Sequence, residues 1–170
     1  MKNTKKNVFL SLMIAYSLVL YFIESMLPSI YFIAPGAKLG LTNIITISLL
    51  YIMGARDAFI VVVIRILLSS IFGGGMSAFM YSISGGIMSL IAMYLMKKIN
   101  FKHVSLIGIS VVGALFFNIG QILVSALIIK NISIFVYLPV LAYISLGTGI
   151  LVGYASKFIV ERTKFIKYLT

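Results

Sequence analysis

Six apolar stretches occupy almost the whole chain and are separated only by short connections. A helix that crosses a membrane needs about 20 apolar residues, so six such stretches leave no length for a separate soluble domain. The stretches run over about Val8–Leu27, Leu39–Met53, Ala58–Phe72, Met76–Met96, Val104–Ile129 and Ile134–Val160. We therefore predict an all-α membrane protein in which residues 1–170 form a single integral membrane domain of six transmembrane helices.

The composition agrees with a membrane protein. The chain is 62% hydrophobic and 10% charged, whereas a soluble domain carries about 25% charged residues. Its isoelectric point near 10.0 would favour nucleic acid in a soluble protein, but here the basic residues lie in short loops and tails, where they would face anionic lipid. The absence of cysteine excludes a disulfide and a thiolate metal site.

The basic residues fall mainly on alternate connections, which fixes a predicted orientation. Connections rich in Lys and Arg stay in the cytoplasm. With both termini cytoplasmic, eleven of the fourteen basic residues face the cytoplasm: Lys2, Lys5, Lys6, Arg56, Lys97, Lys98, Lys102, Lys157, Arg162, Lys164 and Lys167. Only Lys38 and Lys130 then lie outside, and Arg65 lies within a membrane segment. We expect a multi-pass protein of the cell membrane.

Arg65 is the residue that most needs an explanation. A charge near the bilayer centre costs about 3 kcal/mol on insertion scales, so it normally faces a cavity or a partner. At a rise of about 1.5 Å per residue, Arg65 lies roughly mid-membrane, with Asn43 and Lys38 nearer the outside. Because Arg presents a planar fork of donors to carboxylate or phosphate, Lys38 and Arg65 predict an outward-facing site for an anionic group.

A polar stripe on the fifth stretch has two interpretations. Ala114, Asn118, Gln121 and Ser125 recur on one helical face. They either form hydrogen bonds between helices, worth about 0.6 kcal/mol each, or line a pocket at the depth of Arg65. The predicted substrate-binding set is Lys38, Asn43, Arg65, Asn118 and Gln121.

The acidic residues exclude several kinds of chemistry. The chain has three, Glu24, Asp57 and Glu161, expected at the outer mouth, a cytoplasmic turn and the cytoplasmic tail. Paired carboxylates for Mg²⁺ are thus not expected, nor an acidic residue within the membrane to relay protons. The chain also lacks a glycine-rich loop ending in Lys-Ser/Thr for nucleotide binding. We predict that it is not an enzyme and binds no cofactor or metal.

Small residues recur four apart in three pairs, which is the spacing that lets membrane helices approach closely. The pairs are Ser11 and Ala15, Ser110 and Ala114, and Gly149 and Gly153. They are interpreted either as packing within the bundle or as a docking surface for another membrane subunit.

Two runs of residues carry a resemblance to a known family. The run from Pro35 to Asn43, Pro-Gly-Ala-Lys-Leu-Gly-Leu-Thr-Asn, and the run Asn118-Ile119-Gly120-Gln121 resemble the Gx transporter family, also catalogued as heptaprenyl diphosphate synthase component I. The similarity covers essentially the whole chain. One departure is Phe117, where family members often carry His, so this chain lacks any substrate contact that such a histidine would make.

More distantly, the pattern is similar to the S components of energy-coupling factor (ECF) vitamin transporters. That resemblance implies a six-helix bundle with an outward pocket, which docks on a shared transmembrane coupling subunit driven by two ATPases. Ser11 and Ala15 partly match the small-residue docking motif of the first helix in that group. The implied function is capture of a small anionic molecule that is vitamin-like or flavin-like.

The alternative is a noncatalytic accessory membrane subunit, or a transporter linked to isoprenoid or quinone metabolism. The synthase label fits the residues badly, because polyprenyl diphosphate synthesis needs aspartate-rich motifs and this chain has a single Asp. A flavin, another vitamin, and an isoprenoid or quinone precursor all suit the composition, and the sequence does not choose among them.

Overall fold

The structure, a computed structural model, describes residues 2–26, 38–99 and 104–169. The predicted outer connection before Lys38 lies outside these ranges, as does Lys102. Within them the chain forms six α-helices and no strand, so the all-α prediction is confirmed for this part of the chain. The helices are α1 (Lys2–Met26), α2 (Asn43–Ile52), α3 (Ala55–Ser69), α4 (Gly75–Lys98), α5 (Leu106–Ile129) and α6 (Leu138–Leu169), with a π-helical turn over Ser70–Gly74 and a 3-10 helix over Ile132–Tyr137.

Four of the helical segments are long and apolar enough to cross a membrane: Thr4–Met26, Gly75–Lys98, Leu106–Ile129 and Ile132–Thr163. The chain is therefore of the multi-pass membrane type. α2 has 10 residues and α3 has 15, fewer than the 20 or so that a full span needs. Within the described ranges the expected six helices are present, but only four helical segments have the length of a complete span.

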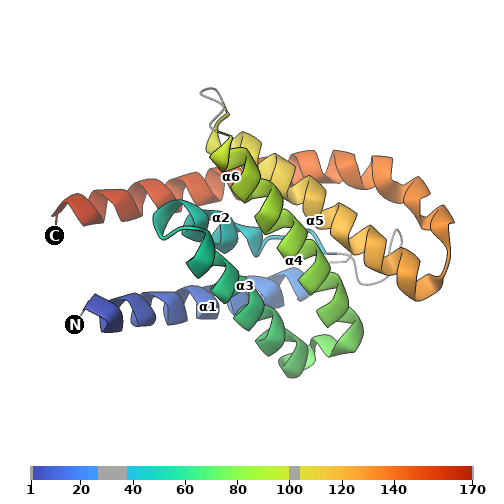
Figure 1. Cartoon of the computed structure of the whole chain (residues 1–170), viewed down its shortest axis with the longest axis horizontal. Helices are drawn as coiled ribbons and strands as arrows, with labels where there is room; N and C mark the ends of the chain where they lie inside the picture. Colours follow the sequence, from blue (N-terminus) through green and yellow to red (C-terminus); the bar gives the residue numbers. More distant parts are fainter. Residues whose placement is uncertain (1, 27–37, 100–103, 170) are drawn as a thin grey trace.

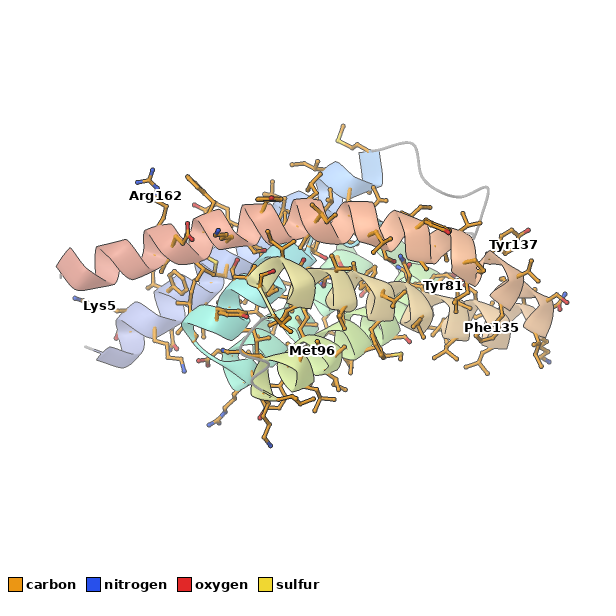
Figure 2. The ribbon with its side chains drawn as sticks, turned by 90° about the horizontal axis from the view of Figure 1, so that it is seen from above. Lys5, Tyr81, Met96, Phe135, Tyr137 and Arg162 are labelled. Atoms are coloured by element: carbon orange, nitrogen blue, oxygen red, sulfur yellow. The ribbon has the colours of Figure 1, made fainter. Side chains whose placement is uncertain are left out.

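The two termini lie at the same end of the molecule (Figure 1). Lys5 and Arg162 mark this end, and Phe135 and Tyr137 mark the opposite one (Figure 2). An ion pair of 2.7 Å between Lys6 Nζ and Asp57 Oδ1 places the turn between α2 and α3 at the terminal end as well. This grouping fits the predicted topology, although the side of the membrane that this end faces stays a prediction.

The short helix α2 lies at the centre of the bundle, in contact with each of the other five α-helices. Its residues from Asn43 to Leu50 are all buried, as expected of a helix in which apolar residues are spread over every side. At its C-terminal end, Lys97 Nζ of α4 donates a hydrogen bond of 2.6 Å to the Leu50 carbonyl, one of the carbonyls that the helix itself leaves unpaired. At about 1.5 Å per residue, α2 spans only half the membrane core, so its N-terminus lies inside the protein.

Glycines allow α5 and α6 to approach closely. A Cβ added at Gly149 would lie 2.5 Å from Val111 Cα, and one added at Gly153 would lie 2.8 Å from Ile107 Cα. This pair of small residues therefore packs within the bundle. Ser11 and Ala15, in contrast, are exposed on α1, on a helix whose contacts are with α2 and α3.

Candidate functional site

The buried face of α1 leads to the site. Among the described residues of this helix, only Ser17, Tyr21 and Glu24 are buried, and their spacing of four and three places them on one face. Glu24 is 6% exposed and lies in the candidate membrane span Thr4–Met26. The sequence predicts Glu24 at the outer mouth, and the structure places it near the C-terminal end of α1, where the turn before α2 covers its carboxylate.

Gly40 makes the contact that covers Glu24. Its backbone N–H donates a hydrogen bond of 2.5 Å to Glu24 Oε1. Gly40 has φ +81°, and a Cβ there would lie 3.0 Å from Asn43 Nδ2 and 3.1 Å from the Phe117 ring. The Gly40 carbonyl accepts a bond of 2.9 Å from the Asn43 N–H. A glycine is thus required both for the backbone conformation and for the close approach, and the carboxylate lies at the positive N-terminal end of α2.

Lys38 is held to this site at two points. Its backbone N–H donates to Gln121 Oε1 of α5 at 3.2 Å. Its Nζ lies 3.2 Å from the centre of the Tyr21 ring, which is a cation–π contact. Burial lowers the pKa of Lys38 to about 8; the nearby Glu24 carboxylate opposes this shift, whereas the Arg65 charge adds to it.

Arg65 enters the same region from the middle of α3. It is 4% exposed, and its Nε and Nη2 have no hydrogen-bond partner among the described residues. Its charge interacts with the Glu24 carboxylate, but the ion pairs within 4.0 Å among the described residues join other groups, Lys6 to Asp57 and Lys157 to Glu161. The guanidinium is therefore buried, and its Nε and Nη2 donors are unused among the described residues.

The three predicted amide residues divide into two groups. Asn43, at the start of α2, has neither its Oδ1 nor its Nδ2 paired among the described residues, and Gln121 has its Nε2 unpaired. Asn118 instead donates to Ser145 Oγ at 2.8 Å and to the Leu141 carbonyl at 3.4 Å, both on α6. The structure thus gives Asn118 an interhelical bond, and its predicted contact with substrate stays untested.

Phe117 and two glycines close the site on the side of α4 and α5. Phe117 is 3% exposed, and a Cβ on Gly85 would lie 3.0 Å from its ring. A Cβ on Gly86 would lie 3.7 Å from Arg65 Nη2, so the backbone of α4 passes beside the guanidinium. The ring fills the space between α4 and the turn before α2.

Sequence reasoning missed Tyr21 and Glu24 as members of the site. The available signal was the helical spacing of Ser17, Tyr21 and Glu24, the polar face of an otherwise apolar helix. Together Glu24, Lys38 and Arg65 give the site one negative and two positive charges, a formal net charge of +1. Among the described residues, no group of three or more His, Cys, Asp or Glu is placed to hold a metal ion. The arrangement is chemically suited to binding an anion.

A sequence model of the family described as heptaprenyl diphosphate synthase component I matches residues 13–159. The matched range includes every described residue of the site from Tyr21 to Gln121. No curated protein and no solved structure matches the chain.

Proposed function

Because the chain belongs to the heptaprenyl diphosphate synthase component I family, we propose that it is a membrane substrate-binding component of the ECF S-component type. In this proposal it captures a small anionic molecule, vitamin-like or flavin-like, from outside the cell. The observation that carries the proposal is Arg65, buried with Nε and Nη2 unpartnered among the described residues and close enough to Lys38 to influence its pKa.

The energetic cost of this arrangement favours a binding role. An unpaired buried polar group costs about 1–3 kcal/mol, and a charged group costs more. A purely structural arginine would be expected to have its donors satisfied by carbonyls or a carboxylate. An anionic ligand would supply the missing acceptors, and Lys38 beside it would add a second positive charge.

The neighbouring groups supply what a ring-containing ligand needs. Among the residues that the structure describes, Asn43 has an unused donor and acceptor side by side and Gln121 has an unused donor, which suits the N–H and C=O edge of a heterocycle. Phe117 and Tyr21 add aromatic surface. Ligand sites commonly combine apolar and aromatic walls with a few polar groups of this kind.

We propose further that uptake needs partner ATPases acting through a transmembrane coupling subunit. The sequence has no phosphate-binding loop of its own. Ser11 and Ala15 are exposed on α1, in a stripe with Val8, Leu12 and Val19, and their small side chains would let a partner helix approach.

Glu24 supports a competing source of energy. A buried acidic residue in a membrane segment is a common proton carrier, so a secondary transporter that moves substrate with protons is a rival mechanism. One measurement distinguishes the secondary transporter from the S component. A secondary transporter accumulates substrate in liposomes as the purified chain alone, whereas an S component requires its partners and ATP.

The family name favours a second candidate, a noncatalytic subunit of a membrane complex linked to isoprenoid or quinone metabolism. A component I implies at least one other component. This candidate predicts that Arg65 meets a partner protein rather than a small molecule.

The test is mass spectrometry of small molecules that co-purify with the detergent-extracted full chain. Wild-type protein is expected to carry an anionic metabolite that is missing from the Arg65→Ala variant, while the variant remains folded in the membrane. Asp57→Asn, which removes a charged partner of Lys6 at the other end of the molecule without touching Arg65, is the matched control and should retain the metabolite. An Arg65→Ala variant that keeps the same metabolite would favour the accessory subunit.

A further inference from the structure

The unpaired edge of Arg65 has a specific shape. Nε and Nη2, the guanidinium nitrogens without a partner among the described residues, lie along the same edge of the planar guanidinium. Their N–H groups point in parallel and match two oxygens of one ligand group. Carboxylate and phosphate both bind this fork through two oxygens, so the edge alone does not distinguish them.

Glu24 supplies the distinction. Its carboxylate is 6% exposed, and this burial opposes its ionisation. The hydrogen bond from the Gly40 N–H and the charges of Lys38 and Arg65 favour the ionised form. With one negative and two positive charges, the site is neutralised by a ligand that carries a single negative charge. A ligand with two charges would leave an excess negative charge next to Glu24 in a region of low dielectric, where like charges repel strongly.

We propose that the site selects a ligand with one carboxylate, held through both oxygens on the Nε–Nη2 edge of Arg65, and that Glu24 excludes phosphate monoesters and diphosphates. This inference rests on the proposed function and names the substrate class of that site. It separates the two metabolic alternatives, because a prenyl diphosphate is multiply charged whereas many vitamin-like molecules carry a carboxylate.

Two probes with the same ring isolate the head group. Benzoate carries one negative charge at neutral pH, and phenyl phosphate carries nearly two because the second pKa of a phosphate ester is about 6. Binding of each to the purified full chain is measured by isothermal titration calorimetry in detergent. Wild-type protein should bind benzoate at least about tenfold more tightly than phenyl phosphate, a difference of about 1.4 kcal/mol. Arg65→Lys should lose most of the benzoate affinity, because a single ammonium cannot form the fork.

The decisive variant is Glu24→Gln, whose amide oxygen can still accept from Gly40 but whose charge is gone. It should reverse the preference in favour of phenyl phosphate. Asp57→Asn is the matched control: it removes one negative charge at the other end of the molecule, where Asp57 pairs with Lys6, and should leave the preference unchanged.

Several results would overturn the inference. Wild-type protein would bind phenyl phosphate more tightly than benzoate, or Glu24→Gln would keep the wild-type preference for benzoate. Failure of both probes to bind at millimolar concentration would also overturn it. The proposed function is judged separately, by the co-purified metabolite and by uptake in cells. A phosphate-bearing metabolite that depends on Arg65 would therefore reject the carboxylate assignment and leave the uptake role standing.

Discussion

Glu24 of α1 and Gly40, three residues before α2, are joined by a hydrogen bond of 2.5 Å from the Gly40 N–H to Glu24 Oε1. They are 16 residues apart in the sequence, and both lie at the N-terminal end of the central helix. The bond fixes the chain as it enters α2 and places a negative charge against Lys38 and Arg65. One residue thus positions a backbone turn and sets the charge of the site.

Removing this bond should destabilise the protein. We expect Glu24→Ala to lower the free energy of unfolding by about 1–3 kcal/mol, because a buried backbone donor loses its acceptor. Glu24→Gln should cost less, since its amide oxygen can replace the carboxylate. Thermal unfolding in detergent, followed by circular dichroism, measures both. Equal stability of wild type and Glu24→Ala would show that the bond contributes nothing.

Lys38 should make anion binding depend on pH. Its pKa is lowered to about 8, so its ammonium group is charged below that pH and neutral above it. Benzoate affinity should therefore fall as the pH rises through about 8, and ligand-free stability should change in the opposite direction. Between about 8 and the ordinary value of 10.5, the unfolded chain binds more protons than the folded one, so stability rises with pH.

The control for this pH dependence is Lys38→Gln. The other charged groups near Lys38 are Glu24 and Arg65, and the Tyr21 ring lies against its ammonium. Affinity should be weaker in Lys38→Gln and should no longer fall near pH 8. The test is to measure the benzoate affinity of wild type and variant by calorimetry across this pH range. If the affinity falls equally with pH in both proteins, a group other than Lys38 is responsible.

In the ligand-free protein, the buried and poorly paired charge of Arg65 should lower the free energy of unfolding. Replacing a buried, poorly paired charge with an apolar side chain of similar length is often neutral or stabilising by about 1–4 kcal/mol. Arg65→Met is therefore expected to unfold at the same temperature as wild type or higher, while losing benzoate binding. A marked loss of stability in Arg65→Met would instead mean that the arginine holds the bundle together.

The helices could be predicted from the sequence because apolar length and helical spacing are local properties. Lys38, Arg65, Asn43 and Gln121 were likewise recognisable, since polar groups in apolar segments need a function. For Glu24, helical spacing places it on one face with Ser17 and Tyr21 but does not show that this face is buried, because its burial depends on a turn that returns over it 16 residues later. The length of α2 also could not be predicted from its apolar stretch, which continues beyond both ends, because turns at Gly40 and Gly54, both with positive φ, limit the helix.

The orientation in the membrane can be tested with introduced cysteines, since the natural chain has none. Cysteines at Ser29 and Asn131 should react with an impermeant reagent in intact cells, because both positions are predicted to lie outside. One at Lys98 should react only after the cells are opened. Labelling in the opposite pattern would place the termini outside and direct the anion site toward the cytoplasm.

The exposed face of α1 gives the last prediction, which concerns the partner. Ala15→Trp should impair uptake in cells and reduce co-purification of partner subunits, because a large side chain keeps a partner helix from approaching. Ligand binding by the isolated protein should remain, since Ala15 is exposed and the site lies on the opposite, buried face of the helix. The matched control is Leu151→Trp on α6. Leu151 is 56% exposed and already has a large side chain, so this variant should preserve uptake.

If Ala15→Trp transports normally, α1 is not the docking surface. If the purified chain accumulates substrate in liposomes without ATP, no partner is required, and Glu24 becomes the residue to examine as a proton carrier.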